Sequence, residues 1–242
     1  MHEYKLADET PVELVANGER VAILLCTPIN LDDLAVGHLF SRGMLRDRAK
    51  VLAVGACADL RTMSVVAPGG VGPDRYGLGT VMATGAGPAA VRADASGLRT
   101  VGSGLGVGMN ELKAWARAMF EAAAIYRQSG GVHCAALVTR PSADGAPYFV
   151  VREDVGRHNA VDKVLGRGFM DGVDFSSACA LTSGRVAADM ILKIISAGIP
   201  VIVSRSIPTT TAAELADAAG VTIVGRIGDQ SPVVYTRPER VV

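Results

Sequence analysis

The second half of the chain alternates short apolar runs with segments of helical length, and this alternation limits the possible folds more than any other feature. Apolar runs at 178–182, 199–203 and 221–224 predict strands, and the segments between them, 186–197 and 212–219, predict helices. Continuously apolar strands that alternate with helices are typical of a largely parallel sheet covered on both faces. The sequence therefore predicts an α/β protein.

The rest of the chain carries further strand and helix signals. Strands are expected at 12–15, 21–26, 79–84, 132–139 and 148–152, and helices at about 30–45, 111–128 and 159–165. Asn17-Gly18 favours a tight hairpin turn between the first two strands. Asn30 and Asn110 are the expected N-caps of the first two helices.

Glycine is concentrated in the middle of the chain, where 12 glycines fall within 69–108. Such a stretch favours loops that join short strands. We therefore expect two regions: an N-terminal α+β portion at 1–108, which includes this glycine-rich connecting segment, and an α/β domain at 109–242.

The composition argues against several classes of function. The 24 basic and 24 acidic residues balance to a net charge of +0, which disfavours nucleic acid or a membrane surface as the main partner. No apolar run approaches the roughly 20 residues of a membrane span, and the first residues have no signal-peptide character. The four cysteines are widely spaced and include no C-x-x-C pair, so we expect a cytoplasmic protein with reduced thiols.

Polar residues that suit anions occupy three strand-to-helix junctions, at 152–158, 182–185 and 204–211. In a parallel sheet these junctions share the edge where the strands end, which is where ligands of open α/β sheets bind. Helix N-termini, hydroxyls and guanidinium groups suit phosphate, so the sequence predicts a pocket for a phosphorylated ligand. The alternative is that the Ser and Thr residues only cap helices. The candidate binding residues are Ser183, Arg185, Ser206 and Thr209.

Two histidines each have a chemical and a structural interpretation. His158 lies four residues from both Asp154 and Asp162, so it could be an acid–base group, but a solvated, salt-linked helix face is the favoured interpretation. His133-Cys134 could ligate a metal, but the chain has no Cys/His cluster with zinc spacing, and a buried or half-buried pair is favoured. The sequence therefore assigns no catalytic residue and no metal ligand.

Several short motifs follow one another in a characteristic order along the chain. The most specific is Arg-Glu-Asp-Val-Gly-Arg-His-Asn-Ala-Val-Asp-Lys at 152–163. The others lie at 9–11, 15–18, 26–28, 31–37, 41–43, 130–137, 183–185, 197–201 and 204–211. Together these motifs resemble the FdhD family of formate dehydrogenase accessory proteins.

The resemblance implies a cytidine-deaminase-like α/β fold, a three-layer sheet with helices on both faces and a smaller N-terminal α+β portion, assembled as a homodimer. It implies sulfur transfer from a cysteine desulfurase to a molybdenum cofactor with two pterin guanine dinucleotides, which formate dehydrogenase needs. The family's cofactor contacts match the segment Arg226, Ile227, Gly228, Asp229, Gln230 and Ser231, for which a simple exposed turn is the alternative.

One departure from the family pattern concerns the thiol that carries sulfur. The family uses a Cys-Gly-x-Cys-Gly loop, but the matching region 83–91 holds no cysteine. Since a persulfide needs a thiolate, another thiol would have to act, and Cys26 and Cys134 lie in matched motifs. The alternative is a module that binds the cofactor, or another guanine nucleotide, without sulfur chemistry. The zinc signature of deaminases is also absent, so the fold analogy predicts no deaminase activity.

Overall fold

Two mixed β-sheets form the framework of the computed structural model, which describes residues 6–75, 98–102, 104–140 and 146–242. The smaller sheet has the order β2-β1-β4-β3, with β1 Thr10–Ala16, β2 Glu19–Cys26, β3 Ala53–Ala56 and β4 Thr62–Val66. The larger sheet has the order β10-β9-β8-β7-β5-β6, with β5 His133–Thr139, β6 Phe149–Asp154, β7 Ala178–Thr182, β8 Val201–Ser204, β9 Thr222–Gly225 and β10 Val233–Val234.

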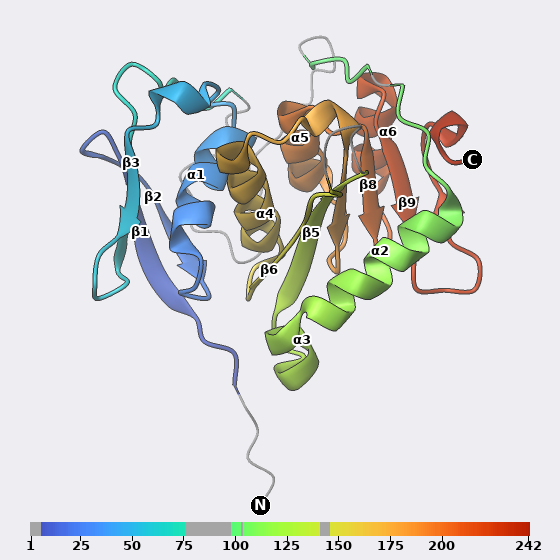
Figure 1. Cartoon of the computed structure of the whole chain (residues 1–242), viewed down its shortest axis with the longest axis horizontal. Helices are drawn as coiled ribbons and strands as arrows, with labels where there is room; N and C mark the ends of the chain where they lie inside the picture. The colour runs from blue at the N-terminus through green and yellow to red at the C-terminus, as the bar shows by residue number, and fades with distance from the viewer. Residues whose placement is uncertain (1–5, 76–97, 103, 141–145) are drawn as a thin grey trace, which may run out of the picture.

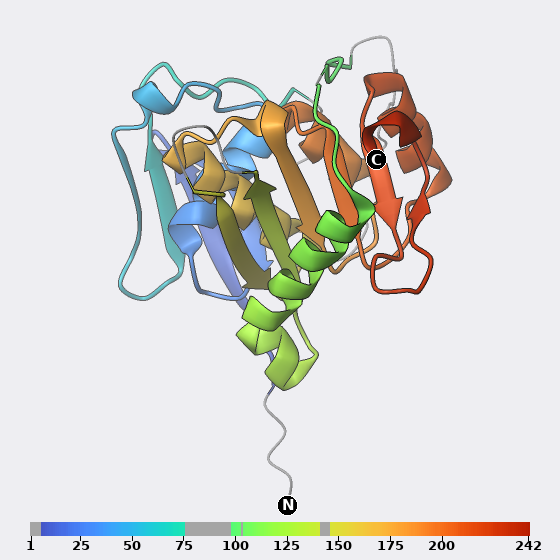
Figure 2. The ribbon, with the colours of Figure 1, turned by 45° about the vertical axis from the view of Figure 1, so that its right-hand side comes forward.

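Helices cover both faces of the larger sheet (Figures 1 and 2). One face carries α4 (Arg157–Asp171), α5 (Ala188–Ala197) and α6 (Thr210–Ala219), and the other carries α2 (Met109–Ala122), which runs into the short α3 (Ala124–Ser129). Helix α1 (Leu31–Ser41) lies between α4 and the smaller sheet. Three 3-10 turns complete the description: η1 Arg48–Lys50, η3 Phe175–Ser177 and η4 Pro238–Arg240.

Alternate residues of the central strands face two different cores. Ala135 and Leu137 of β5 pack with the helices α1, α4, α5 and α6, whereas Cys134 and Ala136 pack with α2. Because both faces are buried, these strands are apolar along their whole length. The structure confirms the predicted α/β fold, with helices on both faces of the sheet and a smaller N-terminal α+β portion.

The expectation of a largely parallel sheet is wrong, because three of the five strand pairings are antiparallel. Strands β7, β8 and β9 pair in parallel, but β5 pairs antiparallel with both β6 and β7, and β10 pairs antiparallel with β9. A continuously apolar strand reports burial on two faces and says nothing about strand direction. The antiparallel direction matters for function, because β5 begins at the edge where β7 and β8 end.

Most helix and strand boundaries agree with those predicted from the sequence, and the exceptions have local causes. The hairpin turn is confirmed, since Asn17 and Gly18 both adopt positive φ angles of 51° and 87°. Helix α1 ends at Ser41 rather than near residue 45, and Gly43 follows in the left-handed region at φ 72°. Asn30 precedes α1 but makes no side-chain cap.

The helix expected at 111–128 is two helices. The chain breaks at Ala123, whose ψ of 86° is not helical, and Gly108 rather than Asn110 precedes the first turn. Helix α4 is longer than expected, because the chain stays helical until Gly172 adopts a positive φ. The strand expected at 79–84 lies outside the described residues.

Side chains from both sides of residue 108 share one core. Leu34 and Leu39 of α1 belong to the same cluster as Val161 and Leu165 of α4. The division into an N-terminal portion and a C-terminal domain at residue 108 stays a prediction. Within the described ranges, every helix is too short or too polar to span a bilayer.

Candidate functional site

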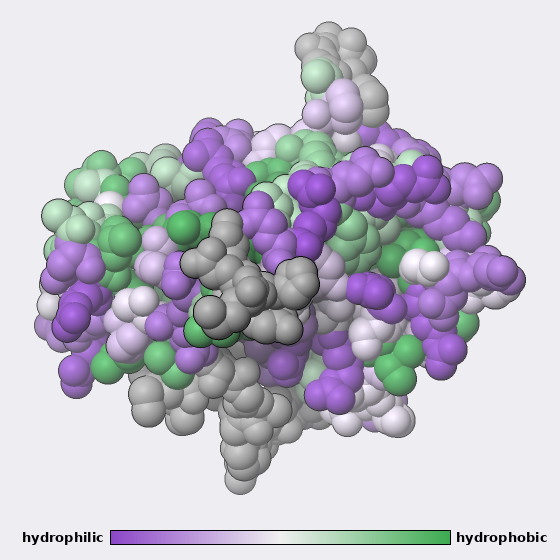
Figure 3. Space-filling model, turned by 90° about the horizontal axis from the view of Figure 1, so that it is seen from below, coloured by the Kyte–Doolittle hydropathy of each residue, from purple (hydrophilic) through white to green (hydrophobic). Residues whose placement is uncertain are grey.

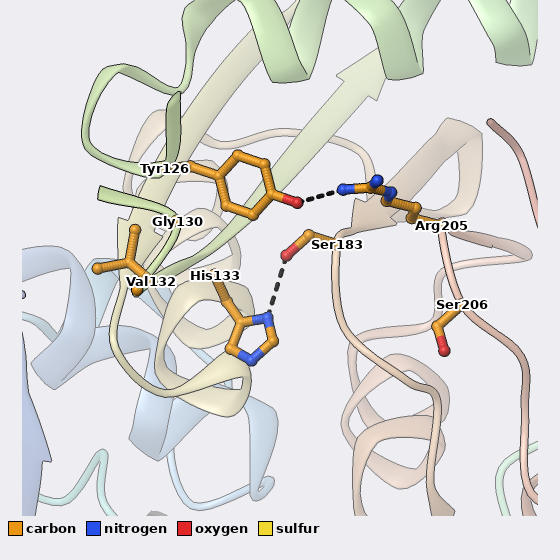
Figure 4. A pocket seen from close by; sticks show the side chains of 8 residues that line it. Tyr126, Gly130, Val132, His133, Ser183, Arg205 and Ser206 are labelled. Carbon is orange, nitrogen blue, oxygen red and sulfur yellow. Dashed lines mark hydrogen bonds between the residues drawn. The ribbon is translucent and has the colours of Figure 1, made fainter. Parts of the chain in front are cut away.

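A pocket of about 480 Å³ opens at the edge of the larger sheet where β7 and β8 end and β5 begins. We call it the rim pocket. Its lining comes from α3, the turn after α3 and two of the predicted junctions (Figure 4): Tyr126, Gly130, Gly131, Val132, His133, Ser183, Arg205 and Ser206. Figure 3 views the molecule from this side, where hydrophilic residues occupy much of the surface.

Ser183 and His133 form a hydrogen-bonded pair inside the rim pocket. The Oγ of Ser183 lies 3.1 Å from Nδ1 of His133, and it also accepts a hydrogen bond from the backbone N–H of Cys134 at 3.1 Å. Burial lowers the pKa of His133, and the nearby positive charge of Arg157 lowers it further. A neutral imidazole therefore faces the pocket at pH 7, beside a serine hydroxyl held in place.

Arg205 supplies the positive charge of the rim pocket. Its guanidinium donates a hydrogen bond to the hydroxyl of Tyr126 and lies 5.7 Å from the centre of the Phe120 ring. The backbone fixes its position, because the N–H of Arg205 donates to the carbonyl of Thr182 at 3.1 Å. A guanidinium has five N–H donors, so most of them remain available to a ligand.

Glu153 positions the wall that carries Tyr126. Its carboxylate accepts hydrogen bonds from the N–H groups of Ile125 at 3.2 Å and Tyr126 at 2.6 Å, at the start of α3. A carboxylate at a helix N-terminus satisfies free N–H groups and interacts favourably with the helix dipole. The end of β6 thus orients a residue that lines the rim pocket.

The first predicted junction contributes a buried ion pair rather than a ligand contact. Asp154 and Lys163 lie 2.7 Å apart with both side chains fully buried, and Nζ of Lys163 also donates to the carbonyls of Thr27 and Glu153. The Thr27 N–H donates to the Asp154 carboxylate at 3.2 Å. These bonds join the N-terminal portion to the start of α4, which is a structural role.

His158 is linked to a carboxylate, as the sequence predicts, but its partner lies on another helix. It pairs with Asp189 of α5 at 3.1 Å, and neither Asp154 nor Asp162 is its partner. Burial lowers the pKa of His158 below its ordinary value. The prediction of a solvated helix face is wrong, because α4 is enclosed by α1, α5 and the larger sheet. The half-buried interpretation of His133 and the buried one of Cys134 are confirmed.

The structure brings two of the four junction candidates into the rim pocket. Ser183 and Ser206 line it. Thr209 caps α6, where its Oγ1 accepts from the N–H of Ala212 at 3.3 Å, so the alternative of a simple helix cap describes this residue. Arg185 is exposed on the same edge and does not line the pocket.

The segment 226–231 runs beside the rim pocket without lining it. The Arg226 N–H donates to the carbonyl of Ser206 at 2.9 Å, and the Ile227 side chain is buried in the core under α2. The N–H of Asp229 donates back to the carbonyl of Arg226 and closes an exposed turn. Gly228, Gln230 and Ser231 are exposed in the same turn. Cofactor contact by this segment stays a prediction.

Most of the pocket lining lies outside the residues that the sequence predicts as ligand contacts. Tyr126, Gly130, Gly131 and His133 reach the pocket because β5 starts at this edge, and that depends on its antiparallel direction. Arg205 lies inside a predicted junction but was not singled out. The signal that could have found these residues is the Gly-Gly-Val-His run at 130–133, which leads into β5 with small residues.

The four cysteines are all free, and three of them are poorly suited to carry sulfur. Cys26, Cys134 and Cys179 are buried, and burial raises the pKa of each thiol to about 12. Cys57 is exposed in the turn after β3. In the described parts of the chain, no three His, Cys, Asp or Glu residues group as metal ligands would.

Comparisons with known proteins agree on one family. The model of the FdhD/NarQ family matches residues 7–242. This chain belongs to the FdhD/NarQ family. The sulfur carrier protein FdhD of Geobacillus kaustophilus is 30% identical over 99% of this chain and 91% of that protein. The Mycobacterium tuberculosis protein of the same name is 35% identical over 98% of this chain and 91% of that protein.

A solved structure supports the fold as well. The crystal structure from Desulfotalea psychrophila, described as a formate dehydrogenase accessory protein, matches with a TM-score of 0.77. Its sequence is 26% identical, and the match covers 97% of this chain and 90% of that one. The family resemblance of the sequence motifs is therefore confirmed.

Proposed function

We propose that this FdhD-family chain holds the guanine-nucleotide end of the molybdenum bis(pterin guanine dinucleotide) cofactor in the rim pocket, on behalf of formate dehydrogenase. The observation that carries the proposal is the convergence of Ser183, Arg205 and Ser206, from two separate junctions, on one pocket beside His133. The cofactor is cargo in this scheme, and the chain needs no catalytic group to hold it.

The side chains that line the rim pocket are of the types that bind a nucleoside diphosphate. The Arg205 guanidinium can pair with phosphate oxygens, and the hydroxyls of Ser183 and Ser206 can donate to them. The Tyr126 ring offers a flat surface to a base. The volume of about 480 Å³ lies within the range of small-molecule sites, which supports a site for one end of the cofactor.

The partners follow from the names of the relatives and from the resemblance. The Desulfotalea psychrophila structure is described as a formate dehydrogenase accessory protein, and the curated relatives are called sulfur carriers. We therefore include formate dehydrogenase as client, a cysteine desulfurase as sulfur source, and a homodimer as the assembly. The free thiols of all four cysteines suit a cytoplasmic location.

Calorimetric titration with GDP tests the proposal. The wild-type chain should bind GDP, and Arg205→Gln should weaken binding by about tenfold or more, because a hydrogen bond to a charged group is worth about 1.5–3 kcal/mol. The control is Arg61→Gln, an exposed arginine in the turn before β4, which should leave the affinity unchanged. Absence of GDP binding by the wild-type chain at millimolar concentration would contradict the proposal.

Sulfur carriage by this chain is the second candidate function, and the exposure of Cys57 favours a specific form of it. The Cys57 thiolate would attack the terminal sulfur of the desulfurase persulfide. A new S–S bond would form on Cys57, and the desulfurase cysteine would leave as a thiolate. Cys26 and Cys134 are disfavoured as carriers because they are buried and hold their protons strongly.

Mass spectrometry after incubation with a cysteine desulfurase and cysteine separates the two functions. A carrier should gain one sulfur atom that dithiothreitol releases, and Cys57→Ser should abolish the gain while Cys179→Ser should not. If the mass of the wild-type chain stays unmodified, the chain does not carry sulfur, and the GDP titration alone decides the binding function.

A further inference from the structure

A second pocket, of about 370 Å³, lies at the opposite edge of the larger sheet, next to the starts of β7 and β8. We call it the arginine pocket. Its lining comes from the end of α1, the loop after it up to η1, the stretch 98–102, the C-terminal ends of α4 and α5, and the residues from α4 to η3. The rim pocket shares none of these segments.

Three arginines surround the arginine pocket. Arg48 donates to the carbonyl of Met170 at 3.0 Å, and Arg99 lies 3.5 Å from the carbonyl of Ser196. Arg46 joins them in the lining. Each bond uses one of the five donors of a guanidinium, so most of the donors of these lining arginines stay available to a ligand.

The acidic charge in the arginine pocket is smaller than the basic charge. Among the described residues that line it, Asp174 is the one carboxylate. Its Oδ1 accepts hydrogen bonds from the N–H of Ser176 at 3.0 Å and from its Oγ at 2.7 Å. Three guanidinium groups against one such carboxylate leave an excess of positive charge, which favours an anion.

The inner wall of the arginine pocket is aromatic. The ring of Phe40 lies 4.6 Å from that of Phe169 and 4.9 Å from that of Phe175, measured between centroids. All three rings line the same hollow as the arginines, so a ligand there would meet an apolar surface as well as positive charge. A pocket with both features suits a ligand with an apolar body and an anionic end.

Helix capping explains only part of this arrangement. Arg48 and Arg99 contact carbonyls at the ends of α4 and α5, which is a common role for arginine. Capping does not explain Arg46 or the hollow itself. Ser196 also lines the pocket and is 1% exposed, and its hydroxyl has no hydrogen-bond partner. Capping does not account for this buried, unpartnered hydroxyl.

We propose that the arginine pocket binds a small organic anion, a phosphate or carboxylate attached to an aromatic or apolar body. The guanidinium groups of Arg46, Arg48 and Arg99 bind the anionic end, and the phenylalanine rings contact the body. This site is separate from the rim pocket, so a result against nucleotide binding in the rim pocket would not contradict anion binding in the arginine pocket.

Calorimetry with phenyl phosphate, benzoate and inorganic phosphate tests the site and its chemistry. Phenyl phosphate or benzoate should bind with a Kd of about 1 mM or tighter, and whichever binds more tightly identifies the anionic group. Inorganic phosphate should bind about tenfold more weakly, because it lacks the apolar body. Equal affinity for phosphate and phenyl phosphate would overturn the role of the aromatic wall, and no saturable binding of either organic anion would overturn the site.

Variants assign the binding to this pocket. Arg46→Gln should weaken phenyl phosphate binding by about tenfold while leaving GDP binding unchanged, and Ser196→Ala should weaken it by a smaller factor. The control Arg117→Gln changes an exposed arginine of α2 and should have no effect. If Arg205→Gln abolishes phenyl phosphate binding and Arg46→Gln does not, the anion binds in the rim pocket and the proposal fails.

Discussion

Gly37 of α1 and Gly166 of α4 lie directly against each other where the two helices cross. A Cβ on Gly37 would lie 1.8 Å from the carbonyl oxygen of Asp162 and 2.9 Å from the backbone nitrogen of Gly166. A Cβ on Gly166 would lie 1.9 Å from the carbonyl oxygen of Asp33. Only glycine on both helices allows this close an approach, which brings the N-terminal portion into contact with the larger domain.

Gly166→Ala should therefore destabilise the protein strongly. The added methyl group meets backbone atoms that cannot rotate away, and overpacking of this kind costs about 1–3 kcal/mol or more in the free energy of unfolding. Urea denaturation measures the change. Gly55→Ala is the control, because a Cβ there has nothing within 4 Å, and it should shift the free energy by less than about 0.5 kcal/mol.

Lys163→Met should be more harmful than the loss of a surface ion pair. It leaves the carboxylate of Asp154 buried without its cation, which costs about 3–5 kcal/mol. The comparison is Arg167→Met, which removes a partly exposed pair with Asp171 and should cost about 1 kcal/mol or less. Similar losses of unfolding free energy in both variants would show that the buried pair has no special role.

The free energy of unfolding should decrease as the pH is lowered from 6.5 to 4, because His38 is buried. Burial lowers the pKa of this histidine from 6.5 to about 4, although Asp162 lies 3.5 Å away. In this range the unfolded chain binds a proton that the folded chain does not, so the free energy of unfolding decreases as the pH falls, by about 3 kcal/mol in full. Below about pH 4 both states are protonated and this contribution is constant.

Denaturation at a series of pH values checks the role of His38. His38→Gln should flatten the slope between pH 6.5 and pH 4, whatever its effect on stability at pH 7. His133 and His158, whose pKa values are also lowered by burial, act in the same direction and should leave a residual slope. An unchanged slope in the variant would show that His38 titrates normally in the folded chain.

Thiol reagents should distinguish Cys57 from the other cysteines. In the native protein Cys57 should react quickly, whereas the three buried thiols should react only after unfolding, since they are inaccessible and their pKa is about 12. Colorimetric titration of free thiols, before and after denaturant, measures both groups. Fast native reaction in a Cys57→Ala variant would contradict this order.

The sequence predicts the elements well because their signals are local. Apolar runs identify β7, β8 and β9, and glycines in the left-handed conformation end α4, α5 and α6. The sequence also predicts that the three junctions lie at one edge of the sheet. The junctions 182–185 and 204–211 share an edge because β7 and β8 are parallel. The junction 152–158 lies at the same edge because β6 and β7 both pair antiparallel with β5 and so run in the same direction.

The candidate site is less predictable because it depends on pairings between distant residues. The partner of His158 is Asp189 on another helix, and no spacing along the chain indicates this pair. Strand direction decides that His133 faces Ser183, and an apolar run does not encode direction. Residue type alone therefore locates Ser183 and Ser206 but misses Arg205 and Tyr126.

The insertion of α1 between the smaller sheet and α4 means that residues 109–242 have no complete interior of their own. Expressed alone, they would lose the Thr27 carbonyl that binds Lys163, the Ser41 hydroxyl that binds Asp162, and the Asp33 carboxylate that binds Arg152. Attempts to obtain residues 109–242 as a minimal fragment should yield insoluble material, and truncations of this protein need to retain the segment that carries these three contacts, Thr27 to Ser41.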